Sequence, residues 1–189
     1  EMRVTKRNGE LQDMLFDKIL TRVKKLGKEA NINLNYSALV IKIIDQLYDK
    51  IQTTKIDELT ADQCASMSSI HYDYGILAAR IIISNCHRNT DADFVTVMKK
   101  LHNYKDKHGA NAPLVTRDLV DFAKTHTKCI KSRIDCNRDF LFDYFGFKTL
   151  ERSYLMRING IVVERPQHMW MRVALSIHKD DIEAALETY

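Results

Sequence analysis

The sequence predicts a mainly α-helical protein with little strand. Only two prolines and six glycines occur among its 189 residues, so few positions interrupt a helix. Apolar residues recur at helical spacing along much of the chain. Two Asn-Gly pairs, each between short β-prone runs, predict two short hairpins. We expect one globular unit with two helical lobes, each carrying one hairpin.

The first predicted element is a hairpin around Asn8-Gly9, in which a two-residue primed turn gives both central residues a positive φ. Lys6 and Arg7 then lie on a short basic ribbon. A helix follows directly, with Asp17 expected to cap its first turn. Its apolar face is predicted to consist of Phe16, Ile19, Leu20, Val23 and Leu26. A basic turn next to the start of a helix suits a bound polyphosphate.

Three further helices are predicted in the first lobe. Ser37 is expected to open the second, which ends near residues 48–50. Residues 53–57 are expected to be an extended entry to the third, with Asp57 or Thr60 as its N-cap. The predicted inward-facing residues of the third helix are Leu59, Met67 and Ile70.

Tyr72 and Asp73 are predicted to form a turn before the fourth helix. Residues 76–83 of that helix are apolar on nearly every side, apart from Arg80. A helix with this pattern is buried all round, so we expect it at the centre of the first lobe.

A polar break at residues 89–93 is the predicted boundary between the lobes. The elements expected beyond it are a helix from Phe94, a solvated loop over 102–113, helices over 116–126 and 127–133, a second Asn-Gly hairpin within 154–163, a helix from Pro166 to about His178, and a last helix capped by Asp180 or Asp181. The predicted domains are therefore residues 3–90 and 91–189.

Composition argues against several classes of function. The formal net charge of +4 is spread evenly along the chain, whereas nucleic-acid binding usually leaves a clustered basic excess. No apolar stretch approaches the roughly 20 residues that cross a bilayer, and no secretory leader is visible, so we expect a cytoplasmic protein without a membrane partner. The four cysteines form no C-x-x-C pair and are expected to be reduced.

Motif searches give no catalytic or metal site. The seven histidines lack metal-ligand spacing, and neither of the usual glycine-rich phosphate loops is present. Phosphate binding would instead need convergent cations, because a nucleoside triphosphate carries about four negative charges. Lys6, Arg7, Lys18 and Arg88 can supply them if the helices bring them together. The alternative is that each is a solvated surface charge.

Residues 3–90 resemble an ATP-cone domain, the regulatory module at the front of many ribonucleotide reductase large subunits. The motifs that carry the resemblance are Val4-Thr5-Lys6-Arg7, Phe16-Asp17-Lys18-Ile19, Thr53-Thr54, Asp57, Asp73-Tyr74 and Leu77-Ala78-Ala79-Arg80. The fold implied is a four-helix ATP-cone capped by a short β-hairpin. The resemblance implies that the following residues bind an allosteric nucleotide: Lys6, Arg7, Gln12, Asp13, Met14, Leu15, Phe16, Asp17, Lys18, Thr53, Asp57 and Arg88.

Within that implied site the residues have different roles. Lys6, Lys18, Thr53 and Arg88 would meet the phosphates, and residues 12–18 would line the nucleotide. Asp57 would lie near the sugar, where a carboxylate can accept hydrogen bonds from ribose hydroxyls and so distinguish ATP from dATP. An alternative for Asp57 is that it only caps the third helix. The sequence departs from the common family pattern at Asn8, Gln12 and Arg88, where Asp, Glu and Lys are usual.

The second half resembles the region just before the catalytic barrel in eukaryotic-type class I large subunits. The motifs are Phe145-Gly146-Phe147-Lys148-Thr149-Leu150-Glu151-Arg152-Ser153-Tyr154 and Glu164-Arg165-Pro166-Gln167-His168-Met169. We interpret these residues as packing, with Phe145 and Phe147 in a core and Met169, Trp170, Val173, Ala174 and Ile177 on one helix face. The resemblance implies that the catalytic cysteines lie beyond Tyr189, so this stretch alone is expected to be inactive.

The function implied is the ATP- or dATP-binding allosteric region of a ribonucleoside-diphosphate reductase, an oxidoreductase that supplies deoxyribonucleotides for DNA replication. Mg²⁺ is expected with the nucleotide. The implied partners are the radical-generating small subunit and further copies of the large subunit. One alternative is a helical interaction module whose cone no longer binds nucleotide. Another is a repressor that joins a cone to a zinc ribbon, but it would need paired C-x-x-C motifs that this sequence lacks.

Overall fold

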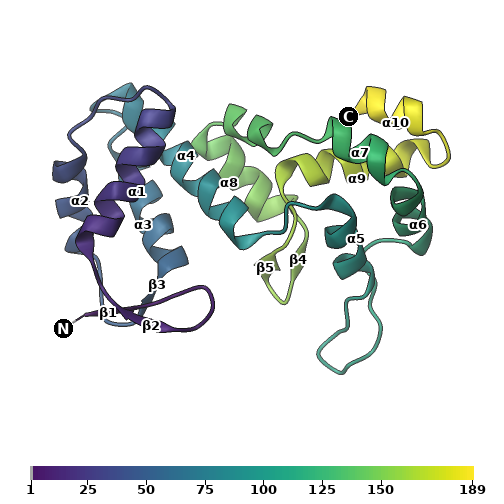
Figure 1. The fold of residues 1–189 in the computed structure, drawn as a ribbon, viewed down its shortest axis with the longest axis horizontal. Coiled ribbons are helices and arrows are strands. Elements are labelled where there is room, and N and C mark those ends of the chain that lie inside the picture. The colour runs from purple at the N-terminus through teal and green to yellow at the C-terminus, as the bar shows by residue number, and fades with distance from the viewer. Residues whose placement is uncertain (1) are drawn as a thin grey trace. The chain divides into compact units, whose positions relative to one another are not determined.

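The structure is a computed structural model that describes residues 2–189, and its residues form two compact units (Figure 1). The first unit contains the residues up to Asn89 together with Phe140–Lys148. The second contains Thr90–Asp139 and Thr149–Tyr189. Helices predominate in the described part of the chain, which confirms the predicted mainly α class. The assignment of residues 3–90 and 91–189 as separate functional domains stays a prediction.

The first hairpin forms at the predicted place but with a different turn. Strands β1 (Arg3–Thr5) and β2 (Leu11–Asp13) pair antiparallel, with Thr5 opposite Leu11. Of the two turn residues only Gly9 has a positive φ, of 85°, so the predicted two-residue primed turn is wrong. The Gly9 N–H donates to the Lys6 carbonyl at 2.9 Å and the Lys6 N–H to the Glu10 carbonyl at 2.8 Å. This is a longer loop in which one left-handed glycine restores the pairing.

A third strand, β3 (Ile51–Gln52), was not expected from the sequence. It pairs parallel to β1, with Val4 opposite Ile51, and gives the sheet order β2-β1-β3. Val4 and Ile51 are buried together with Ile56 in a small cluster. The sheet thereby fixes the basic loop at residues 6–10 beside the start of the following helix.

Helices α1 (Phe16–Glu29), α2 (Tyr36–Ile44), α3 (Thr53–Ser66) and α4 (Tyr72–Asn89) form the first unit with this sheet (Figure 1). Three expected helix starts are wrong. Asp17 lies inside the first turn of α1, because Leu15 holds the extended N-cap conformation. α2 begins at Tyr36, one residue before the expected Ser37, and Asn35 caps it. Residues 53–57 are already helical in α3, so the suggested caps Asp57 and Thr60 both lie within the helix.

The core of the first unit surrounds α4, as its apolar pattern predicts. Leu77, Ala78, Ile81, Ile82 and Ile83 are buried there. The residues expected to form a turn, Tyr72 and Asp73, belong instead to the first turn of α4. Ile70 is 70% exposed, so its predicted inward orientation is wrong.

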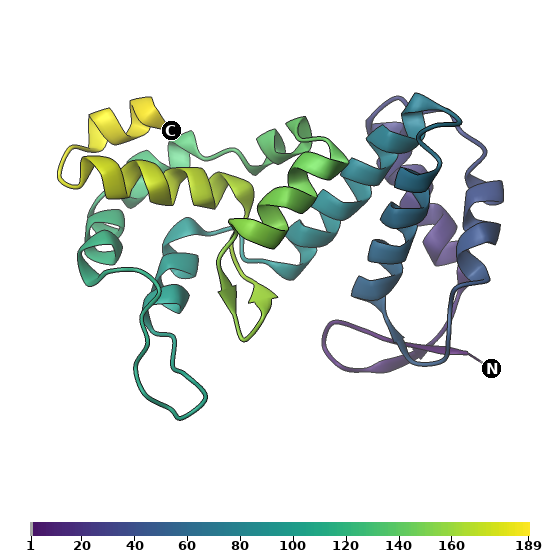
Figure 2. The same ribbon diagram turned by 180° about the vertical axis from the view of Figure 1, so that it is seen from behind.

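The second unit is also helical. Its elements are α5 (Phe94–His102), α6 (Arg117–Thr125), α7 (Thr127–Arg133), a 3-10 turn over Cys136–Leu141 that it shares with the first unit, the later part of α8 (Tyr144–Ser153), β4 (Arg157–Ile158), β5 (Ile161–Val162), α9 (Pro166–His178) and α10 (Ile182–Thr188). The long loop between α5 and α6 and the β4–β5 hairpin extend away from these helices (Figure 2).

Several local expectations for the second unit are confirmed. Asn159 and Gly160 have φ values of 51° and 78°, as a primed turn requires. Pro166 is the first residue of α9, and Asp181 caps α10 through a hydrogen bond to the Ala184 N–H. No helix in residues 2–189 combines the length and apolar character of a membrane span.

The packing predicted for the second half is partly wrong. Phe147 is fully buried, but Phe145 is 71% exposed on the same helix. Met169 and Ala174 are buried, whereas Trp170, Val173 and Ile177 are exposed on α9. Helical spacing alone therefore did not identify which face of α9 is covered.

Candidate functional site

A cavity of about 1040 Å³ opens in the first unit among the hairpin, α1, α3 and α4. Ligand pockets usually measure about 300–1,000 Å³, so this one has room for a nucleotide. Six lysine and arginine residues and four carboxylate residues line it. The predicted site residues in its wall are Lys6, Arg7, Gln12, Asp13, Met14, Leu15, Asp17, Lys18, Thr53, Asp57 and Arg88. Phe16, the remaining predicted residue, does not line it.

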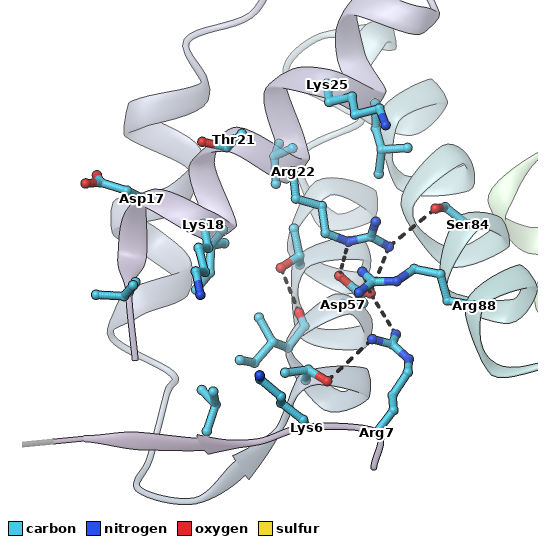
Figure 3. A pocket seen from close by; sticks show the side chains of 18 of the residues that line it. Lys6, Arg7, Asp17, Lys18, Thr21, Arg22, Lys25, Asp57, Ser84 and Arg88 are labelled. Carbon is cyan, nitrogen blue, oxygen red and sulfur yellow. Dashed lines mark hydrogen bonds and ion pairs between the residues drawn. The ribbon is translucent and has the colours of Figure 1, made fainter. Parts of the chain in front are cut away.

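Asp57 is the electrostatic centre of this cavity. It sits in α3 and is only 6% exposed. Arg22 of α1 holds it with two hydrogen bonds, from Nε to Oδ1 at 2.7 Å and from Nη2 to Oδ2 at 2.9 Å. Nη2 of Arg7 lies 3.3 Å and Nη1 of Arg88 3.7 Å from Oδ2 (Figure 3). A buried carboxylate needs such partners, and here three guanidinium groups from three elements supply them.

Arg7 connects the hairpin loop to α3 and α4. Beyond Asp57, its Nε donates to Asn89 Oδ1 at 2.6 Å and its Nη2 to Asn85 Oδ1 at 2.7 Å. Nη1 lies 3.4 Å from Thr53 Oγ1. The Arg7 side chain is therefore held mainly by the protein itself.

Arg88 lies among like charges near the C-terminal end of α4. Burial together with the neighbouring Arg22 and Arg7 guanidinium groups lowers the pKa of Arg88, and Asp57 opposes that shift. An arginine stays charged even so. The arrangement means that an additional anion near Arg88 would relieve repulsion among the three cations.

Two lysines face each other across the cavity. Lys18 extends from α1 toward the hairpin, and Lys6 extends from the hairpin toward α1 (Figure 3). Lys6 has a loose ion pair with Glu10, at 4.0 Å, and its side chain is 42% exposed. In the described part of the chain Lys18 has no carboxylate partner. Neither ammonium group is therefore held in a close ion pair.

Comparison with known proteins agrees with this geometry. An ATP cone domain family model matches residues 2–89, and the model of the ribonucleotide reductase all-alpha domain matches residues 140–189. The chain therefore resembles the N-terminal part of ribonucleotide reductase large subunits, with an ATP cone followed by part of the all-alpha domain. Along its whole length it is 46% identical to the ribonucleoside-diphosphate reductase large subunit of Plasmodium falciparum and 46% to the large chain of Cryptosporidium parvum, covering 23% of each. It is 43% identical to the Danio rerio large subunit, of which it covers 24%.

The chain thus spans about a quarter of the length of the large subunits that it matches. The matched regions lie at the N-terminal part of those relatives. Sequence reasoning missed four residues that line the cavity: Arg22, Lys25 and Ser84 within the ATP-cone match, and Phe140 beyond it. The sequence could have indicated Arg22 and Lys25, because they follow Lys18 by four and seven positions and so share its face of α1.

Residues 2–189 contain no group of three or more histidine, cysteine, aspartate and glutamate side chains placed to hold a metal ion. Both oxygens of Asp57 already accept hydrogen bonds from Arg22.

Proposed function

We propose that the first unit binds ATP or dATP as an allosteric effector of a ribonucleoside-diphosphate reductase. The observation that carries this proposal is the convergence of Lys6, Lys18, Arg22 and Arg88 on one cavity of an ATP cone. These residues come from the hairpin, α1 and α4. The alternative was that these residues are solvated surface charges. Such charges would point in separate directions and would not line a common cavity.

We propose that the positive charges of the cavity determine where the phosphates bind. Lys6 and Lys18 lie on opposite sides of the cavity. Arg88 lies beside Arg7 and Arg22, so three guanidinium groups surround the single carboxylate of Asp57. A polyphosphate between them replaces cation repulsion with charge-assisted hydrogen bonds. Thr53 adds a hydroxyl group in the same wall. Residues 12–15 and Asp17 line the remainder and would surround the nucleoside, with Mg²⁺ bound through the phosphates.

Asp57 is proposed to sense the ribose. An ionised carboxylate has about four lone-pair positions, so two bonds from Arg22 and one from Arg7 leave about one position for a sugar hydroxyl. A site that hydrogen-bonds one hydroxyl can reject the analogue that lacks it. ATP and dATP differ by one such group, which gives Asp57 a way to separate an activating from an inhibiting effector.

For the whole protein we propose the reduction of ribonucleoside diphosphates in the cytoplasm, with a radical-generating small subunit and with other large subunits as partners. Effector binding would then favour one subunit assembly over another, because a ligand shifts an equilibrium only through its different affinity for the two states. The names of the relatives support this assignment. The present chain alone is proposed to be catalytically inactive.

Calorimetry and thermal unfolding with ATP and dATP test the proposal. At a hundredfold excess over Kd, one bound nucleotide adds about 2.7 kcal/mol, which for a chain of this size raises Tm by about 5–10 °C. Lys6→Ala should weaken ATP binding, whereas Lys24→Ala, exposed on α1 and outside the cavity, should not. Asp57→Asn should change the ratio of the ATP and dATP affinities.

A helical interaction module without nucleotide binding is the second candidate. It is favoured by one observation, that Arg7, Arg22 and Arg88 already have Asp57 as a common partner. Equal melting temperatures with and without either nucleotide, together with no heat on mixing, would support it over the effector site.

A further inference from the structure

The first unit includes a segment that is remote from it in sequence. Phe140–Lys148 belongs to the same compact unit as the residues up to Asn89. Phe147 is fully buried in the cluster that contains Leu77 and Ile81 of α4. The Tyr144 hydroxyl donates a hydrogen bond to the Asp62 carboxylate of α3. The core of the cone is thus completed by residues that lie well beyond the ATP-cone match, which ends at residue 89.

Phe140, at the start of this segment, forms part of the cavity wall. It lines the cavity together with Lys25 of α1 and with Ser84 and Arg88 of α4. The segment's own fold holds it there, because Phe142 and Tyr144 also pack against the core of the unit. The wall at this side of the cavity is therefore aromatic, in a site otherwise rich in charge.

Two residues of α4 fix the Phe140 ring. The guanidinium carbon of Arg80 lies 4.4 Å from the centre of the ring, and the His87 ring meets it edge-on with the centroids 5.4 Å apart. Arg80 Nη2 also lies 3.6 Å from Glu29 Oε2, at the end of α1, and Glu29 lines the same cavity. A chain of contacts therefore joins α1, Arg80 and Phe140 at the cavity wall.

From this placement we propose that the bound nucleotide packs against Phe140, so that nucleotide binding and the docking of residues 140–148 stabilise each other. The proposal rests on the effector function proposed above and extends the regulatory site to a segment outside the cone match. The coupling must act in both directions, because a ligand that stabilises the docked segment is bound more tightly when the segment is docked.

Substitutions at Phe140 test the contact, and Phe145 offers a matched control. Phe145 is a phenylalanine of the same segment but is 71% exposed. In the full chain, Phe140→Ala should raise the Kd for ATP about five- to tenfold, the usual size of effect for truncating an aromatic side chain in a binding site. Phe140→Leu keeps an apolar wall and should raise Kd less. Phe145→Ala should leave Kd within about twofold of the unsubstituted chain.

Hydrogen exchange provides a readout that a purely structural role of Phe140 would not change. Saturating ATP should slow amide exchange in residues 140–148 as well as in the hairpin and α1. In Phe140→Ala the hairpin and α1 should still be protected by saturating ATP, but the protection gained by residues 141–148 should fall.

The possible outcomes separate the two proposals. If ATP binds and Lys6→Ala weakens it, but Phe140→Ala and Phe140→Leu bind normally and residues 140–148 gain no protection, the role of Phe140 is overturned and the effector function stands. If ATP produces neither heat nor protection anywhere in the chain, both proposals are overturned.

Discussion

Arg22 and Asp57 form a two-bond ion pair between α1 and α3, with donor–acceptor distances of 2.7 and 2.9 Å. The Arg22 side chain is 23% exposed and that of Asp57 8%. A lysine in place of Arg22 could not make this contact, because only the planar guanidinium group forms two parallel hydrogen bonds with a carboxylate.

Arg22→Ala should destabilise the first unit. Removing one partner from a buried pair usually costs about 3–5 kcal/mol, but Arg7 and Arg88 remain beside Asp57, so we expect a loss of about 2 kcal/mol in the free energy of unfolding. Urea unfolding measures it. Lys24→Ala on the same helix should change stability by less than about 0.5 kcal/mol. Equal stabilities for the two variants would show that the pair contributes nothing.

Gly27→Ala should destabilise α1, although alanine favours helices by about 1 kcal/mol. A Cβ at residue 27 would overlap the Tyr36 ring, with Cζ only 2.6 Å away. Tyr36 is 8% exposed and its hydroxyl donates to the Ile32 carbonyl, so moving the ring aside would disturb its packing and break this hydrogen bond. Overpacking of this kind costs about 1–3 kcal/mol. Thermal unfolding of Gly27→Ala beside the exposed neighbour Lys28→Ala measures it, and a rise in Tm for Gly27→Ala would contradict the close contact.

His168 should make the second unit sensitive to mild acid. Burial lowers its pKa to about 4 from 6.5, even though Nε2 donates to the Ala92 carbonyl at 3.2 Å. Between these two values the unfolded chain takes up a proton that the folded chain does not, so stability falls as pH falls, by about 3 kcal/mol in all. Above pH 6.5 the residue should have no effect on the pH dependence.

The measurement is urea unfolding of the unsubstituted chain and of His168→Gln at several pH values between about 7 and 4. The variant lacks the titrating ring, so its stability should decline less steeply. The hydrogen bond from Thr96 lowers the pKa of Asp93 to about 2, so the folded chain titrates at Asp93 below this pH range. Parallel pH profiles for the two proteins would rule out His168 as the source.

The cysteines should differ sharply in reactivity. Cys64 is fully buried in α3 and its burial raises the pKa of its thiol to about 12, whereas Cys129 is exposed. Only a thiolate reacts rapidly with alkylating reagents. Mass spectrometry after timed alkylation near pH 8 should show Cys129 labelled first and Cys64 labelled only on unfolding. Early labelling of Cys64 in a Cys129→Ser variant would contradict the burial.

The sequence predicted the elements that local chemistry determines. Pro166 fixes the start of α9 and Asp181 caps α10, because a fixed φ and a side-chain acceptor act within a few residues. The two-residue strand β3 escaped prediction because it carries no periodic signal and forms only through its pairing with β1. The turn at Asn8-Gly9 was misjudged for a related reason, since the same dipeptide fits two loop lengths.

The candidate site shows the same limit. Family resemblance indicated most of the residues that line the cavity, but Arg22 was missed because its importance depends on Asp57, which is 35 positions away in the sequence. Asp57 itself was a plausible helix cap from its neighbours alone. Only the packing of α1 against α3 and α4 shows it as a buried carboxylate shared by three arginines.

The position of Phe147 has a consequence for how the protein is made. A ribosome delivers the chain from its N-terminus, and domains commonly fold as they emerge. Residues up to Asn89 emerge first, but their apolar cluster lacks Phe147 until the whole α5–α7 stretch has been translated. During that interval the hydrophobic surface that Phe147 later covers is exposed to chaperones. The first unit cannot complete its core until Phe147 has been translated.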